Sequence, residues 1–250
     1  MTQATIDTLR WIRRFHAAPG SPIRLVCLPH AGGSATYYLP VAQALSPAVD
    51  VLAIQYPGRQ DRRAEPGVEN IQDLAAQIYE QLRPWADRPI ALFGHSMGAT
   101  LAFEVARLME GDGIDPAHLF LSGRRAPSHN REERVHLRDD AGLVAELRRL
   151  DGTQSQVLED EELLRMVLDA IRTDYKAVET YAYRPGPPLA APVTVLVGDD
   201  DPTTTLEEAQ GWRDFTRGAF ELKVFTGGHF YLNAHQAEIL RVITSRLAFA

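Results

Sequence analysis

Six short apolar runs recur along the 250-residue chain, and each is mainly a continuous hydrophobic stretch. They read IRLVCLP from Ile23, VDVLAIQYP from Val49, IALFG from Ile90, HLFLSG from His118, VTVLVG from Val193 and ELKVFTG from Glu221. Continuous runs of this length predict strands that are covered on both faces, as in a parallel sheet. Because helical patterns lie between most of the runs, the sequence predicts an α/β fold with a mostly parallel central sheet flanked by helices.

One of these helices has a clear start and end in the sequence. Asn70 is a favourable N-cap residue, and Pro84 marks the end of the pattern. The apolar positions between them follow the 3.6-residue period of an amphipathic helix. These positions are Ile71, Leu74, Ala75, Ile78 and Leu82.

The alternation breaks once, between Gly123 and Arg184, where no strand pattern is present. Two amphipathic patterns lie in this interval, the first at Leu143, Leu147 and Leu150, the second at Leu164, Val167, Leu168, Ile171, Tyr175 and Val178. A structureless connection of this length is rare, so we expect a helical insertion. The sequence predicts a single domain over 1–250, with the insertion at about 124–184 between the HLFLSG and VTVLVG strands.

Composition and charge exclude several classes of protein. A formal net charge of −7 argues against a general nucleic-acid binder, which needs a concentrated basic face. Cys27 is the one cysteine and lies in an apolar run, so we expect a buried structural thiol. The sequence shows neither a signal-peptide pattern nor an apolar window of about 20 residues, and we therefore expect a cytoplasmic protein without a membrane partner.

The segment Gly-His-Ser-Met-Gly at 94–98 separates a predicted strand from a predicted helix. A sharp strand-to-helix turn can present Ser96 at the edge of the sheet, because glycines two residues away on each side let the two backbones approach. A tight turn with an incidental serine is the alternative. The context favours Ser96 as a nucleophile, which needs a neighbouring base to accept its proton.

His229 has the best position for that base. It follows the last predicted strand, on a Gly-Gly turn just before the terminal helix. His235 lies later, on that helix, while His95 flanks the serine and His30 lies in an earlier loop. The alternative reading of His229 is a turn residue whose side chain is satisfied locally.

A carboxylate must hold the imidazole in one tautomer. VTVLVGDDDP ends the penultimate predicted strand with Asp199, Asp200 and Asp201, and a plain solvated turn is the alternative reading of these acids. The order serine, acid, histidine along the chain fits strand-end loops of this fold. The other place for such an acid, after LFLSG, carries Arg124 and Arg125 instead.

An oxyanion in such a site needs two backbone donors. The amide after the nucleophile, Met97, is one, and Ala31 in the loop LPHAGGSATYY is our candidate for the other. The glycines of that loop match neither the dinucleotide-binding nor the P-loop pattern, so a nucleotide site is not expected.

The assembled blocks resemble the α/β-hydrolase superfamily, and more narrowly the stand-alone type II thioesterases of polyketide and nonribosomal peptide synthesis. The blocks are LPHAGGSATYY, IQYPGRQDRRAEP, FGHSMGATLAFEVAR, LSGRRAP, VGDDDP and GGHFYL, in this order. The chain departs from the family pattern at Leu28, where Phe is frequent, and at Thr100, where an aliphatic residue is common.

The resemblance implies an enzyme that hydrolyses acyl groups from the phosphopantetheine thiol of acyl or peptidyl carrier proteins, without a cofactor or metal of its own. The catalytic serine, acid and base of the family then correspond to Ser96, Asp201 and His229, with Asp200 as the alternative acid, and its oxyanion amides to Ala31 and Met97. The insertion corresponds to a helical lid over the acyl chamber. We expect a monomer.

Five arginines near the start of the insertion are candidates for docking an acidic carrier: Arg124, Arg125, Arg131, Arg134 and Arg138. The alternative is that several of them pair with the neighbouring acids Glu132, Glu133, Asp139 and Asp140. Two other functions remain open from the sequence. An esterase or lipase would use the same triad on free esters or acyl-CoA, and a binding protein would keep the scaffold without the chemistry.

Overall fold

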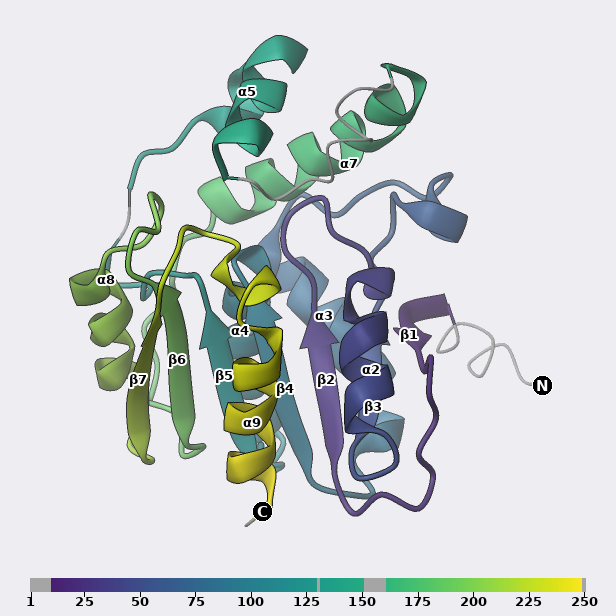
Figure 1. Cartoon of the computed structure of the whole chain (residues 1–250), viewed down its shortest axis with the longest axis vertical. Coiled ribbons are helices and arrows are strands. Elements are labelled where there is room, and N and C mark those ends of the chain that lie inside the picture. Colours follow the sequence, from purple (N-terminus) through teal and green to yellow (C-terminus); the bar gives the residue numbers. More distant parts are fainter. Residues whose placement is uncertain (1–9, 130, 151–160, 249–250) are drawn as a thin grey trace.

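The computed structural model describes residues 10–129, 131–150 and 161–248. In this part of the chain, seven strands form one sheet in the order β1-β3-β2-β4-β5-β6-β7 (Figure 1). The strands are β1 (Ile12–Arg13), β2 (Arg24–Leu28), β3 (Asp50–Ile54), β4 (Ile90–His95), β5 (His118–Ser122), β6 (Val193–Gly198) and β7 (Phe220–Phe225).

The six predicted strands are β2 to β7, and they pair in parallel throughout. β2 to β6 are buried along their whole length, as their continuous apolar runs predict. β7 departs from this expectation, because it is an edge strand and most of its residues are partly exposed. β1 was not predicted from the sequence, because a strand of two residues is too short to show a period; it pairs antiparallel with β3.

Successive side chains of β2 face opposite sides of the sheet. Leu25 and Cys27 join the core under α2 (Leu39–Leu45) and α9 (Gln236–Leu247). Val26 and Leu28 join the core under α3 (Ile71–Leu82) and α4 (Met97–Gly111), on the opposite face (Figure 1). Cys27 is free and fully buried, and burial raises the pKa of its thiol, as expected for a structural cysteine.

The predicted start of α3 is confirmed by its cap. The side chain of Asn70 accepts a hydrogen bond from the backbone N–H of Asp73 at 3.0 Å. The five apolar positions named above are all buried against the core. The cap fixes where this helix begins, and the five buried side chains fix which of its faces packs on the core.

Between β5 and β6 the chain forms helices above the carboxyl ends of the strands (Figure 1). These are the short η4 (Val135–Leu137), α5 (Asp140–Leu150) and α7 (Glu161–Glu179), and their apolar side chains form a third, separate core. We call residues 124–184 the lid segment. The α-helix α8 (Leu206–Gln210) follows β6. Short 3-10 helices lie in other connections of the described chain: η1 (Ala35–Tyr38), η2 (Gln60–Arg62), η3 (Arg83–Trp85), η5 (Gly211–Phe215) and η6 (Tyr231–Asn233). Among the described residues, the helices are too short or too polar to cross a membrane.

Candidate active site

The turn at Ser96 joins β4 directly to α4. Ser96 has φ 55° and ψ −117°, a backbone conformation that L-residues rarely adopt. A Cβ on Gly94 would lie 2.0 Å from the carbonyl oxygen of Gly98, and a Cβ on Gly98 would lie 2.0 Å from that of Leu28. The two glycines therefore permit the close approach of β4 and α4 that was predicted from the sequence, and Gly98 also lets α4 approach β2, which was not predicted.

Ser96 and His229 line the same cavity at the carboxyl end of the sheet, with a volume of about 430 Å³. They also share a smaller hollow of about 30 Å³ that continues toward His30 and Phe230. Ser96 is partly exposed, and its N–H donates to the carbonyl oxygen of Ser122 at 2.8 Å, which ties the turn to the end of β5. The structure thus brings together the two side chains that the sequence placed 133 residues apart.

His229 is held by the loop that follows β6. Its Nδ1 atom lies 2.8 Å from Oδ2 of Asp201 and 3.0 Å from the hydroxyl of Thr203. The N–H and the hydroxyl of Thr203 both donate to the other oxygen of Asp201, each at 2.8 Å. The Asp201 carboxylate is therefore fixed on both oxygens, and its orientation fixes that of the imidazole.

Electrostatics favour the ionised form of Asp201. Burial opposes its charge, but hydrogen bonds from His229 and Thr203 outweigh this, and the pKa of the carboxyl lies below its usual range. The neighbouring acids are exposed, and Asp199 accepts from the N–H of Gly227 at 2.8 Å. Of the three adjacent acids, Asp201 is therefore the one that contacts His229.

The other histidines near Ser96 are buried and favour the neutral form. Burial, then the neighbouring His229, lowers the pKa of His30 to about 3 and holds that of His95 well below its usual value. Nδ1 of His95 lies 2.9 Å from the hydroxyl of Ser122, which in turn lies 2.7 Å from that of Tyr231. His235 is bonded to Thr226, away from this cavity. His229 is thus the histidine available beside Ser96.

The two candidate oxyanion amides belong to segments on either side of Ser96. Ala31 lines the cavity together with Ser96, and Met97 is the first residue of α4. In the described part of the chain, neither amide donates a backbone hydrogen bond. Both N–H groups are therefore free to donate, and Ala31 lies at the wall of the cavity.

Comparison with known proteins identifies the family. A family model described as a thioesterase domain matches residues 23–247. The chain belongs to the thioesterase family. This thioesterase is 55% identical over 235 residues to the probable cadicidin biosynthesis thioesterase of Streptomyces griseus, covering 94% of this chain and 65% of that protein. It is 51% identical over 244 residues to thioesterase PikA5 of Streptomyces venezuelae, covering 97% of this chain and 87% of that one.

A solved structure supports the same assignment. The type II thioesterase BorB from the borrelidin biosynthetic cluster matches with a TM-score of 0.90 and 57% identity, covering 95% of this chain and 97% of that chain. The α/β-hydrolase fold predicted for this thioesterase is thereby confirmed. Its resemblance to type II thioesterases is confirmed as well.

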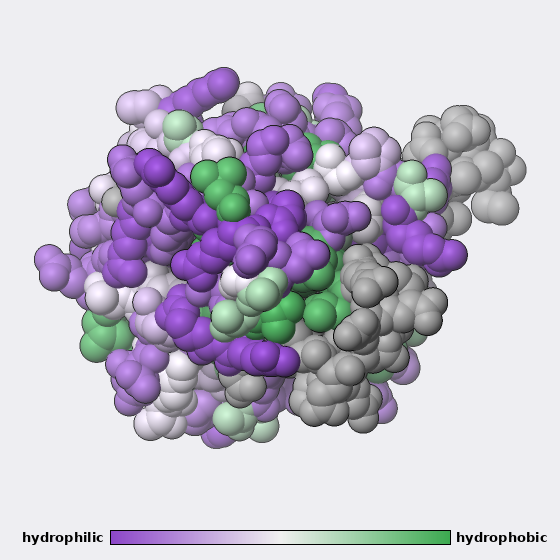
Figure 2. All heavy atoms as spheres, turned by 90° about the horizontal axis from the view of Figure 1, so that it is seen from above, coloured by the Kyte–Doolittle hydropathy of each residue, from purple (hydrophilic) through white to green (hydrophobic). Residues whose placement is uncertain are grey.

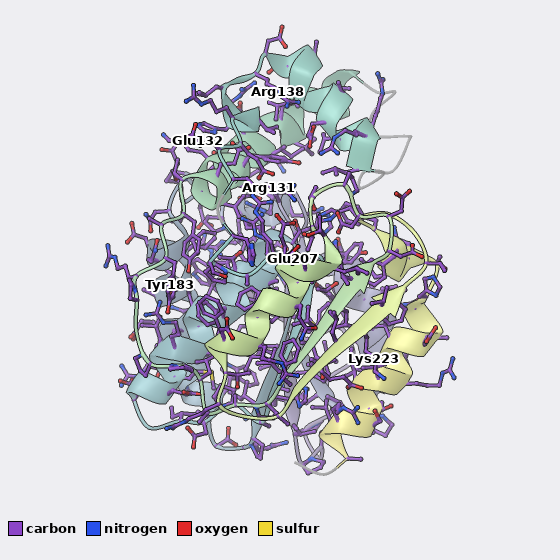
Figure 3. The ribbon with its side chains drawn as sticks, turned by 90° about the vertical axis from the view of Figure 1, so that its left-hand side faces the viewer. Arg131, Glu132, Arg138, Tyr183, Glu207 and Lys223 are labelled. Carbon is purple, nitrogen blue, oxygen red and sulfur yellow. The ribbon has the colours of Figure 1, made fainter. Side chains whose placement is uncertain are left out.

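The candidate docking arginines of the thioesterase differ in their surroundings. Arg125 does not belong with the others, because it is only 5% exposed and is bound by Glu133 and the carbonyl oxygen of Thr203. Arg131 pairs through two hydrogen bonds with Glu208 on α8. Figure 3 labels Arg131 and the residue next to its partner, Glu207. Arg124 lines the cavity, and burial lowers the pKa of its guanidinium to about 10.

The remaining two arginines lie at the surface of the lid segment and also line the cavity that holds Ser96 and His229. The side chains of Arg134 and Arg138 are 74% and 48% exposed, and they pair with Glu132 and Glu146 respectively. Figure 3 shows Arg138 and Glu132 at the lid end of the molecule, far from Lys223 on β7. Figure 2, which views the molecule from above the lid, shows mostly hydrophilic side chains with a smaller hydrophobic group near the middle.

Sequence reasoning missed the role of Thr203 in the site. An aspartate commonly accepts hydrogen bonds from the backbone N–H and the hydroxyl of a threonine two residues later, which forms a local turn. The segment DPT at 201–203 carries this pattern. Sequence reasoning also missed Asp174 and Arg59, which come from segments 115 residues apart and meet only in the fold.

Proposed function

We propose that this thioesterase hydrolyses acyl thioesters from the phosphopantetheine arm of carrier proteins, and so clears stalled or aberrant acyl groups in polyketide or nonribosomal peptide synthesis. The observation that carries the proposal is that Ser96 shares a cavity with His229, whose Nδ1 atom lies 2.8 Å from the carboxylate of Asp201. The names of similar proteins support the biosynthetic setting. We also propose that it works as a cytoplasmic monomer.

The proposed mechanism uses protein groups alone. The Ser96 oxygen attacks the thioester carbonyl carbon while His229 accepts the hydroxyl proton, and the amides of Ala31 and Met97 hold the oxyanion. The carbon–sulfur bond then breaks, and the leaving thiolate takes the proton from His229. The product of this half-reaction is an acyl ester on Ser96.

The second half-reaction returns the enzyme to its starting state. His229 accepts a proton from a water molecule, whose oxygen attacks the acyl ester. The carbon–oxygen bond to Ser96 breaks, Ser96 recovers its proton from His229, and the free acid leaves. Asp201 keeps its negative charge throughout and stabilises the imidazolium that forms twice in each cycle.

The lid segment supplies much of the wall of the cavity that Ser96 and His229 also line. Leu150 on α5 and Tyr175 and Val178 on α7 lie beside Ser96 and His229. An acyl group on Ser96 would contact these residues, while the pantetheine arm leads outward to the carrier. We therefore propose that residues 124–184 act as the lid of the acyl chamber.

A comparison of three substrates with one acyl group tests the proposal. We expect kcat/KM for an acetyl carrier protein to exceed that for acetyl-CoA and for an aryl acetate, with all three activities lost in Ser96→Ala. Equal or better hydrolysis of the free ester would favour the alternative, an esterase. No hydrolysis of any of the three would favour a binding protein.

A further inference from the structure

A buried carboxylate on the lid helix α7 contacts the loop that carries the Ala31 amide. Asp174 is 1% exposed, and its Oδ2 atom accepts from the backbone N–H of Gly32 at 2.7 Å. The same oxygen accepts from Nη1 of Arg59 at 2.7 Å, and Oδ1 accepts from Nη2 at 2.8 Å. One side chain thus joins α7, the segment after β3 and the loop after β2.

The two ends of the loop are held without α7, because the hydroxyl of Tyr56 donates to the carbonyl oxygen of Pro29 at 3.0 Å and the N–H of Ala35 donates to the side chain of Gln55 at 2.9 Å. The N–H of Gly33 closes a turn onto the carbonyl oxygen of His30 at 2.9 Å, and the carbonyl of Gly33 accepts from Arg59 at 3.0 Å. Gly32 has φ +75°, and a Cβ there would lie 2.5 Å from the side chain of Ile171 on α7. The turn that includes Ala31 is therefore packed directly against α7 and bonded to it through Asp174.

The ion pair is a costly way to stabilise a fold. Arg59 is 7% exposed, and removing two charges from water offsets most of their attraction, so an apolar pair of the same size often stabilises as well. Buried charges with all their hydrogen bonds made do, however, fix distances and directions closely. The geometry of the contact therefore points to positioning rather than to stability.

We propose that Asp174 is a positioning residue for the oxyanion hole, through which the lid helix sets the direction of the Ala31 amide. The inference rests on the proposed function, since it needs the oxyanion to lie at Ala31 and Met97. It assigns to the lid a second role beside enclosing the acyl group. The oxyanion hole is complete only when α7 lies against the loop.

The proposal predicts a loss in kcat with little change in KM. A displaced oxyanion donor weakens the transition state and leaves the bound ester nearly unaffected. A misplacement of about 1 Å can lower the rate about 100-fold, and this is the size of effect that we expect for Asp174→Asn. Asp174→Glu keeps the charge beside Arg59 but shifts the carboxylate by one carbon, so it should fold well and still lose rate.

Glu179 provides a matched control on the same helix. Its side chain is 1% exposed and accepts from the N–H groups of Val135 and His136, within the lid segment. Glu179→Gln also disturbs a buried carboxylate of α7, but one that does not touch the loop of Ala31. We expect its kcat for an aryl acetate to stay within about threefold of the wild type.

The test measures kcat and KM for the aryl acetate in the wild type and the three variants. It also measures the affinity of each protein for two inhibitors. An alkyl trifluoromethyl ketone forms a tetrahedral adduct whose oxyanion needs the hole, whereas the amide analogue of an acyl pantetheine binds without an oxyanion. We expect both Asp174 variants to lose kcat and ketone affinity by the same factor while amide affinity and KM stay unchanged.

Two results would overturn the inference while leaving the proposed function intact. One is full ketone affinity and kcat in Asp174→Glu, and the other is an equal loss in Glu179→Gln. A wild-type protein that hydrolyses neither thioesters nor the aryl acetate would instead overturn the proposed function, and this inference with it.

Discussion

The imidazole Nδ1 of His229 lies 2.8 Å from the carboxylate Oδ2 of Asp201, and the two residues come from the loops that follow the neighbouring strands β7 and β6. Both residues are buried, at 3% and 8% exposure. Because parallel strands end at the same edge of a sheet, residues 28 positions apart meet there beside Ser96.

Asp201→Asn should lower kcat by about four orders of magnitude, since an amide would no longer hold the tautomer that accepts the serine proton. Asp200→Asn is the matched control, because Asp200 is adjacent in sequence but exposed. Steady-state kinetics with an aryl acetate compare the two variants. Near-normal turnover in Asp201→Asn, or a large loss in Asp200→Asn, would show that the acid has been assigned to the wrong residue.

Thr203→Val should lower kcat about tenfold. The variant loses the hydroxyl that donates to Asp201 and lies beside His229, while the backbone N–H of residue 203 still holds the carboxylate. Thr203→Ser retains the hydroxyl and should keep most of the activity. Equal kcat values for the valine and serine variants would mean that the hydroxyl does not help to orient the pair.

Ser96→Gly should raise the free energy of unfolding by about 1 kcal/mol. A residue with φ 55° and ψ −117° carries about 1–3 kcal/mol of backbone strain, and glycine relieves it at the cost of about 0.5–1 kcal/mol of chain entropy. Ser96→Ala keeps its Cβ and should change stability little. Urea unfolding measures both variants, and a glycine variant that is less stable than the alanine variant would contradict the strain.

The free energy of unfolding should fall as the pH drops from 7 to 5. His30 and His95 have lowered pKa values in the folded state, so below the ordinary value of about 6.5 the unfolded chain binds protons that the folded protein does not. Each histidine should cost about 2 kcal/mol of stability by pH 5. Urea unfolding at both pH values measures the loss of stability. The loss should be smaller in His30→Gln, by the contribution of that one histidine. A stability that stays flat over this range would exclude buried neutral imidazoles.

Charge reversal of Arg134 and Arg138 should lower kcat/KM for an acyl carrier protein about tenfold at low salt, with less effect at high salt. Turnover of an aryl acetate should fall much less, because both arginines also line the cavity but an aryl acetate has no carrier to dock. Lys223→Glu is the control, because Lys223 lies on β7, far from the lid segment (Figure 3). Equal losses on the carrier and the aryl ester would discard docking at these arginines.

Much of the fold follows from the sequence because its strands are buried on both faces. The runs at β2 to β6 need no partner strand to be recognised, and the Asn70 cap is a local signal. β1 was missed because a strand of two residues carries no pattern. The position of the lid segment over the site was inferred from a family resemblance, since periodicity predicts its helices but not where they pack.

In the candidate site, too, some residues could be predicted from the sequence and others could not. Ser96 and His229 stand at turns that the sequence marks with glycines, so their positions could be predicted. The contact of Asp174 with Gly32 could not, because it depends on how α7 crosses a loop 142 residues away in sequence. Charge alone also misplaced Arg125, whose partners Glu133 and Thr203 bury it.

The most direct test of the central claim is covalent labelling with a fluorophosphonate, followed by peptide mapping of the adduct by mass spectrometry. We expect one phosphonyl group per chain, on the Ser96 oxygen, with labelling slowed at least 1000-fold in His229→Ala. Absence of an adduct on Ser96, or an undiminished labelling rate in His229→Ala, would contradict it.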